Sequence, residues 1–425
     1  MSDILSKLKL VFRDTVLRKR IIITVVLLAV FRLLASIPIP GVDQAQLARF
    51  FGGSQFFGLL DIFSGGGLSN LSIVMIGVSP YITASIIMQL LTMMSPRLKA
   101  LYQEEGEAGR KKFSQWSRLI SVPLALLQAV GFIFLLEKQG VIVHLTSFDL
   151  AVNVIVVTTG SILLMWLGEI ITEFGIGNGI SLIIFSGIIA SLPQAISQLI
   201  FAYDPSMLLS YIAFLVVAIA IIAAVVYITE AERPIPVTYA KRVRGNRVYG
   251  GISTYLPLRL NQAGVIPIIF ALSILLFPQL ILNVLQGIIT DPSIQSWITT
   301  LLGFLANNWV YAVMYFLLVF VFTYFYTAVT FDPHQIAENL QKNGAFIPGV
   351  RPGGSTSEYI GKVLTRITLV GALFLGTIAV LPLVIKALMP HINSIAIGGT
   401  ALLIAVSVIL DLVKKVDAQI SMREY

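Results

Sequence analysis

Long stretches without Asp, Glu, Lys or Arg recur along the whole chain. A helix needs roughly 20 predominantly apolar residues to cross a bilayer, and most of these stretches reach or exceed that length. Where a stretch is longer, we assign the excess to a connecting loop. The pattern predicts ten spanning helices, near residues 21–37, 73–93, 118–136, 152–171, 180–200, 207–229, 262–281, 308–329, 366–385 and 394–412.

The first apolar stretch follows a charged amino terminus, as it would in a cleavable signal peptide. Residues 37–41 have no small-x-small cleavage pattern, and Arg32 lies inside the apolar region, so we interpret the stretch as a retained helix. Arg32 itself has two interpretations. It reaches the membrane surface or pairs with a neighbouring helix, or it has a functional role.

Composition supports a membrane protein. Charged residues make up 12% of the 425 positions and hydrophobic residues 57%, whereas a soluble domain carries about 25% charge. The mean hydropathy is +0.90. The chain has no cysteine, which excludes disulfides and thiolate metal sites. The three histidines are scattered (His144, His334 and His391), so we expect no metal site and no cofactor.

The distribution of positive charge predicts the orientation. With the amino terminus in the cytoplasm, Arg49, Lys138 and Lys386 lie outside and Arg32 lies in the first helix, while the other 25 of the 29 lysines and arginines lie inside. Cytoplasmic loops of membrane proteins carry such an excess of basic residues. We therefore expect both termini of a multi-pass protein to lie in the cytoplasm.

Five predicted helices fall in residues 1–205 and five in residues 206–425. An odd number of spans per half inverts the second half relative to the first, as in many channels and transporters. Large cytoplasmic loops are predicted at residues 230–260 and 330–365, and a further one at 95–117. Outside, residues 56–63 form an apolar stretch too short to span, which predicts a re-entrant half-helix or an interfacial turn.

An ion-coupled secondary transporter with inverted repeats is the alternative function. Such a carrier typically places ionisable residues near the middle of the membrane. Nine of the ten predicted helices have none at their centres, and Glu169 and Glu173 lie towards a cytoplasmic end. The glycine-rich residues 175–179 lack the spacing of a dinucleotide-binding loop, and we interpret them as a tight turn.

Four cations gather in the short stretch 239–247 of a cytoplasmic loop. Most cationic loops serve only to set the topology. This one belongs to a loop of about 30 residues, larger than topology requires, which favours a docking surface for an acidic or phosphate-rich partner.

At eight places the sequence resembles the SecY family, in the order and topological positions of that family. The matching segments are FR with IPIPG within 31–41, FSGG at 63–66, GVSPYITASIIMQLL at 77–91, EGEAGRKK at 105–112, MWLGE at 165–169, GIGNGIS at 175–181, AGVIP at 263–267 and GAFIPGVRPG at 344–353.

The resemblance implies an all-α polytopic fold. Its two pseudo-symmetric, inverted five-helix halves form a clamshell around an hourglass pore, with a re-entrant plug helix at residues 57–66. The pore passes unfolded secretory polypeptides across the cytoplasmic (inner) membrane. It also releases membrane-protein segments sideways into the lipid, between helices two, three, seven and eight. The family is not enzymatic.

The resemblance also implies roles for particular residues. The pore ring is Val78, Ile82, Ile180, Ile184, Ile269 and Ile404, and the plug includes Phe57, Leu60, Asp61, Ile62, Phe63, Ser64, Gly65 and Gly66. The lateral gate includes Thr83, Ile86, Ile87, Ser273 and Phe277. Lys241, Arg242, Arg247 and Arg351 would dock the SecA ATPase or the RNA and protein of a ribosome. SecE and SecG are the implied membrane partners, signal peptides and nascent polypeptides the clients, and membrane lipid the surroundings of the gate.

Overall fold

A computed structural model of the protein describes most of the chain. The described residues are 14–40, 61, 64–68, 70–103, 105–138, 140–142, 146–201, 205, 208–240, 242–244, 247–249, 253–289, 291–388 and 399–421. They divide into two compact units. The first unit comprises Met1–Met207, Leu272–Tyr311 and Ile392–Tyr425, and the second comprises Leu208–Ala271 and Ala312–His391.

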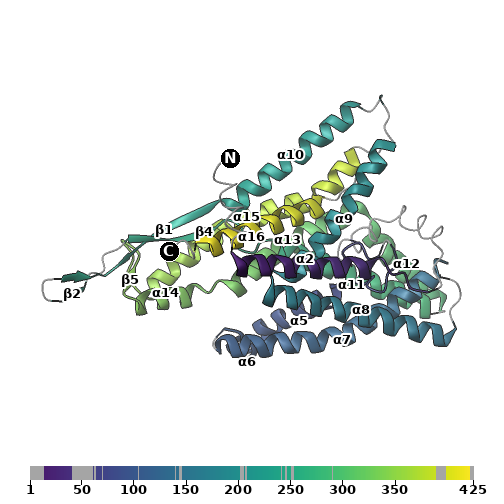
Figure 1. Ribbon diagram of the computed structural model, residues 1–425, viewed down its shortest axis with the longest axis horizontal. Coiled ribbons are helices and arrows are strands. Elements are labelled where there is room, and N and C mark those ends of the chain that lie inside the picture. The colour runs from purple at the N-terminus through teal and green to yellow at the C-terminus, as the bar shows by residue number, and fades with distance from the viewer. Residues whose placement is uncertain are drawn as a thin grey trace. The chain divides into compact units, whose positions relative to one another are not determined.

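The first unit is a set of packed helices. It contains α2 (Thr15–Ala35), α5 (Ser79–Met94), α6 (Pro96–Gln103), α7 (Gly106–Lys138), α8 (Ser147–Phe174), α9 (Gly179–Phe201), α12 (Pro292–Ala306) and α16 (Gly399–Ser421), with most of α11 (Ile266–Ile288). In sequence order α5 packs on α7, α7 on α8, and α8 on α9 (Figure 1). The first helix, α2, contacts both α8 and α9, and α16 also packs on α9.

The second unit combines helices with a small antiparallel sheet. Its helices are α10 (Leu208–Glu230), most of α13 (Asn308–Thr330), α14 (Pro333–Lys342) and α15 (Gly354–Leu388). Its strands are β1 (Glu232–Tyr239), β2 (Arg242–Arg244), β3 (Arg247–Tyr249), β4 (Ser253–Arg259) and β5 (Ala345–Phe346), with the sheet order β4-β1-β5 and a separate pair β2-β3. The all-α prediction is therefore wrong for these loops, although the described chain is mostly helical.

The sheet has a one-sided core for a simple geometric reason. Successive side chains of a strand point to opposite faces, and in β1 Ile235 and Val237 are buried while Pro234 and Pro236 are exposed. The same cluster includes Ile360, Val363, Leu364 and Ile367 of α15. Residues spaced three and four apart lie on one face of a helix. The apolar face of β1 and this apolar face of α15 therefore bury each other.

Five helices of the described chain are long and apolar enough to cross a membrane. These spans are Gly106–Glu137, Ser147–Phe174, Tyr211–Glu230, Asn308–Lys342 and Gly354–Leu381. Shorter apolar helices occur at Ser79–Met94, Gly179–Pro193 and Ile266–Gln279. Each of the ten predicted stretches contains described helix, which confirms a polytopic helical membrane protein. The number of ten spans stays a prediction.

Hydropathy misplaced several helix boundaries. The second predicted helix begins at Ser79 rather than at residue 73, because turns occupy residues 73–78 and Pro80 stands in the first turn of α5. In the other direction, α7 and α15 extend well beyond their apolar cores, to Gly106 and Gly354. Charged side chains end a hydrophobic stretch, but they do not end a helix.

Two helices lie in segments that were predicted to be loops. α12 begins after the N-cap Asp291, whose carboxylate accepts a hydrogen bond of 2.9 Å from the N–H of Ser293. α14 begins in the same way after Asp332, which accepts from the N–H of His334 at 2.9 Å. In both cases a proline follows the aspartate, and this Asp-Pro pair is a helix-start signal. Neither helix was recognised because the prediction considered only membrane-length stretches.

A glycine sets the approach of α8 to the turns before α5. A Cβ at Gly160 would overlap the carbonyl oxygen of Ile73 and would lie 3.3 Å from Cγ1 of Val74. Next to it, the Ser161 hydroxyl donates to the carbonyl oxygen of Gly77 at 2.7 Å. The absence of a side chain at Gly160 therefore allows the backbone contact and the hydrogen bond beside it.

Gly160→Ala should destabilise the folded protein by about 2 kcal/mol, because an extra methyl group in a closely packed site forces the backbone apart. The matched control is Gly303→Ala in α12, where nothing lies within 4 Å of an added Cβ and alanine is the better helix former. Thermal unfolding in detergent should show a lower midpoint for the first variant and no decrease for the second. Equal midpoints would mean that α8 can move away without cost.

Candidate functional site

The described residues of 65–78, before α5, are not helical, and the hydroxyls of Ser64 and Ser72 pair part of the backbone there. Ser64 Oγ donates to the carbonyl oxygen of Asp61 at 2.9 Å and accepts from the N–H of Leu68 at 2.9 Å. Ser72 Oγ donates to the carbonyl oxygen of Gly67 at 2.9 Å and accepts from the N–H of Val74 at 3.3 Å. Inside a membrane, irregular backbone is tolerated only where such partners exist.

A two-bond bridge joins this segment to the end of α2. The N–H of Ile39 donates to the carbonyl oxygen of Leu71 at 2.9 Å, and the N–H of Ile73 donates to that of Ile37 at 3.0 Å. Pro38 and Ser72 face each other as an isolated β-bridge. The chain that leaves the end of α2 therefore comes back beside residues 37–39 when it reaches residues 71–73.

An apolar cluster lies around this junction. It combines Ile39, Leu68, Leu71, Met75 and Ile76 with side chains of α7 and α8, among them Phe132, Ile133, Leu136, Val154 and Val157. Leu71 and Leu136 are completely buried. Close packing of these side chains, together with the two backbone bonds to the end of α2, fixes residues 68–76 against α7 and α8.

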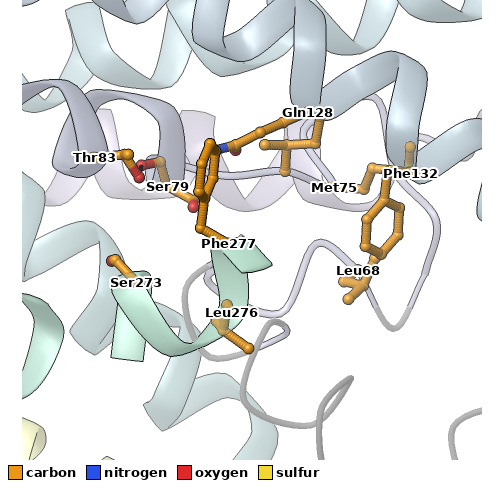
Figure 2. A pocket seen from close by; sticks show the side chains of 10 residues that line it. Leu68, Met75, Ser79, Thr83, Gln128, Phe132, Ser273, Leu276 and Phe277 are labelled. Atoms are coloured by element: carbon orange, nitrogen blue, oxygen red, sulfur yellow. Dashed lines mark hydrogen bonds between the residues drawn. The ribbon is translucent and has the colours of Figure 1, made fainter. Parts of the chain in front are cut away.

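A small cavity of about 30 Å³ lies beside this cluster (Figure 2). Ser79 and Thr83 line it from α5, Gln128 and Phe132 from α7, Ser273, Leu276 and Phe277 from α11, and Leu68, Met75 and Ile76 from the turn segment. The volume holds one or two water molecules. The lining therefore combines four neutral polar side chains, two from α5 and one each from α7 and α11, with six apolar side chains.

Three of the predicted lateral-gate residues, Thr83, Ser273 and Phe277, line this cavity together. Ile86 and Ile87 lie further along α5, where Ile86 is buried and Ile87 half-buried, and neither lines the cavity. The gating role of all five residues stays a prediction.

Sequence reasoning missed Gln128, Ser79 and Phe132. Gln128 is 6% exposed and stands in the middle of an apolar stretch. Only ionisable residues inside the predicted helices were taken as functional candidates, so the neutral amide of Gln128 was not among them. A glutamine at the centre of a span was the available signal, because an amide in hydrocarbon needs a polar partner.

The predicted plug lies only partly within the described chain. Phe57, Leu60, Ile62 and Phe63 lie outside it, whereas Asp61 and 64–66 are described. Ser64 and Gly65 are buried, and Gly66 is half-buried. Its carboxyl-terminal end is therefore packed inside the first unit.

The predicted pore ring is mostly buried. In the first unit Val78, Ile82, Ile184 and Ile404 are each at most 5% exposed. Ile180 is half-buried, and its Cδ1 would lie 2.6 Å from a Cβ at Gly168 of α8, so it packs on that helix. Ile269 belongs to the second unit and is also buried. Their role as a ring stays a prediction.

The predicted docking residues that the structure describes, Arg242, Arg247 and Arg351, belong to the two large loops of the second unit. Arg242 belongs to β2 and Arg247 to β3, which pair antiparallel, while Lys241 lies outside the described residues. Arg351 is exposed, and its carbonyl oxygen accepts a 2.8 Å bond from the hydroxyl of Thr356. β5 pairs with β1 through Thr238 and Phe346. The structure thus joins the two large loops, 230–260 and 330–365, into one sheet.

Long apolar helices, with a non-helical segment and a polar-lined cavity packed among them, define a polytopic α-helical membrane protein. The family model described as SecY matches residues 72–413. Protein translocase subunit SecY of Corynebacterium glutamicum is 42% identical over 97% of both chains, and SecY of Streptomyces coelicolor is 40% identical over 97% of both. The chain belongs to the SecY family, and it is a protein translocation channel.

Solved structures agree on the fold. A protein-conducting channel is similar with a TM-score of 0.66 at 20% identity, covering 95% of this chain and 92% of that one. Sec61 from a canine ribosome–channel complex is similar with a TM-score of 0.62 at 20% identity, with the same coverage. At these identities the comparison establishes the architecture alone. The family confirms the predicted function over the transporter alternative.

Proposed function

We propose that this channel moves unfolded secretory polypeptides across the cytoplasmic membrane and releases membrane-protein segments sideways into the lipid. The cavity shared by α5, α7 and α11 carries this proposal. Its surfaces are neutral, partly polar and incompletely packed, so separating them costs less than separating a close-packed apolar contact.

The proposed architecture has ten spans in two inverted five-helix halves, residues 1–205 and 206–425, which form a clamshell around an hourglass pore. Both termini lie in the cytoplasm, as 25 of the 29 basic residues on the inner side support. The chain provides the path and has no catalytic site, and its partners supply the energy from ATP or GTP.

Closure has two layers in this proposal. A ring of Val78, Ile82, Ile180, Ile184, Ile269 and Ile404 excludes water, since an apolar constriction gates by dewetting. The outer segment 57–66 is a plug that fills the funnel beyond the ring. The burial of Ser64 and Gly65 at the end of that segment supports its seat in the first unit.

The proposed partners are SecE and SecG in the membrane, and SecA or a ribosome on the cytoplasmic side. The sheet that joins the two large loops supports a docking surface on both of them, because β1 and β5 pair the loop that contains Arg242 and Arg247 with the loop that contains Arg351. Among similar structures, Sec61 and Ssh1 are described in complexes with ribosomes. Signal peptides and nascent chains are the clients, and membrane lipid receives the released segments.

The first prediction concerns the gate. Cysteines at Thr83 and Ser273, joined by a short thiol-specific crosslinker, should stop translocation and membrane insertion, because they tie α5 to α11 across the cavity. The chain has no native cysteine, so only the introduced pair reacts. The control pair is Ser121→Cys with Met165→Cys, since these side chains already touch at 3.3 Å within the first half. A crosslinked Thr83–Ser273 pair that still transports clients would show that the gate lies elsewhere.

The second prediction concerns the ring. Ile404 is completely buried, and Ile404→Asn should raise resting ion conductance about tenfold, because an amide in the constriction can hydrogen-bond water. Leu402 is half-buried and lies about 200° away around α16, so Leu402→Asn should leave conductance at the wild-type level. Ion leak is measured in vesicles matched for folded channel. Equal leak in both variants would place the pore on another face of α16.

The third prediction concerns docking. Charge reversal of Arg351 together with Lys241 and Arg242 should weaken SecA or ribosome binding about tenfold or more, because exposed cations steer an acidic partner. Lys362→Glu is the control, since Lys362 is also exposed in the second unit but pairs with Glu358 at 2.7 Å. Binding is titrated on vesicles with equal channel content. Wild-type affinity in the triple variant would leave these cations a role in topology only.

A further inference from the structure

Arg32 is a charged side chain inside the first membrane helix, and the structure shows where its hydrogen bonds go. Nη1 donates to the carbonyl oxygen of Gly65 at 2.9 Å, and Nη2 donates to the carbonyl oxygen of Ser186 in α9. The guanidinium carbon lies 5.3 Å from the centre of the Phe31 ring. An arginine in a membrane is costly unless such groups surround it. The side chain therefore points inwards rather than towards the membrane surface.

The two acceptors belong to different parts of the first unit. Gly65 lies near the carboxyl-terminal end of the outer segment 57–66, whereas Ser186 lies within α9. The planar, forked guanidinium can donate in two directions at once, which an ammonium on a single flexible stem cannot reproduce with the same geometry. Asp61 adds a favourable charge interaction with Arg32 from the same outer segment. One side chain of α2 therefore ties the outer segment to α9.

The seat of Gly65 depends on the absence of a side chain. Gly65 has φ +68° and Gly66 has φ +80°, backbone conformations that favour glycine. A Cβ at Gly65 would lie 2.5 Å from Cζ of Phe31, which is completely buried. On the opposite side, a Cβ at Gly187 of α9 would overlap the backbone of Gly65. Gly65 and Gly66 thus lie in a narrow space between α2 and α9, where Arg32 contacts them.

We propose that Arg32 is a latch that holds the outer segment in its closed position by bonding to the backbone of Gly65. When the segment leaves, the guanidinium loses that acceptor and its closeness to Asp61, so the closed state is favoured while both are in place. The acceptor is a backbone carbonyl oxygen, and the bond requires the close approach that the absence of side chains at Gly65 and Gly187 allows. This inference rests on the proposed plug role of residues 57–66.

The test uses the full-length channel in vesicles with equal amounts of folded protein, and it measures resting ion leak. Arg32→Gln should raise the leak about tenfold, the scale of one lost charge-assisted hydrogen bond. Arg32→Lys should give an intermediate leak, because it keeps the charge and loses the fork. Gly65→Ala should also leak with Arg32 intact, because its methyl group displaces the Gly65 carbonyl. It provides the test if the Arg32 variants fail to fold.

A double-mutant comparison separates the latch from the plug. Deletion of residues 57–66 removes the segment and should leak by itself, and Arg32→Gln should add nothing further in that background. If the deletion leaks while Arg32→Gln and Gly65→Ala do not, the plug stands and the latch is wrong. An equal increment from Arg32→Gln with and without the deletion also overturns the latch. A deletion without leak overturns the plug role itself.

Discussion

In hydrocarbon every backbone N–H and C=O needs a partner, since each unpaired group costs several kcal/mol, and this requirement governs the first unit. The helices meet it largely within themselves, whereas the turns between the outer segment and α5 meet it only in part through their own backbone bonds. Their other partners are the hydroxyls of Ser64, Ser72 and Ser161 and the bridge to the end of α2. Arg32 follows the same rule, because its charged guanidinium is tolerated in this region where backbone carbonyl oxygens accept its hydrogen bonds.

The same unit contains firm and loose packing side by side. Around Leu71 and Leu136 the apolar cluster is completely buried, and Gly160 brings α8 onto the turn backbone. A short distance along the chain, Ser79 and Thr83 border a cavity with Gln128 and Ser273. A close-packed contact resists separation, whereas a hydroxyl-lined gap already has room for water. A channel that opens sideways needs this contrast, with a fixed frame next to a surface that can part.

In the second unit the two large loops fold into one structure. The exposed Pro234 and Pro236 alternate with the buried Ile235 and Val237, which bury one face against the stripe of α15. β5 then joins the second loop to the first. Pairing the two loops in one sheet fixes their backbones relative to each other, so they lose less conformational entropy on any binding event than two separate flexible loops would.

The sequence by itself determined the helical membrane class, the places of the apolar helices, the expected orientation and the SecY family. Hydropathy, charge balance and motifs depend on residues that are close together in the sequence, so the sequence alone is enough to identify them. The sequence also contains the signals for the helix starts after Asp291 and Asp332, because each aspartate is followed by a proline, although these signals were not used in the prediction. The tertiary structure decided that Gln128 shares a cavity with Ser273, that β1 pairs with β5, and that Arg32 donates to Gly65 and Ser186. Each of these contacts joins residues far apart in the sequence, and its partner depends on how several helices pack at once.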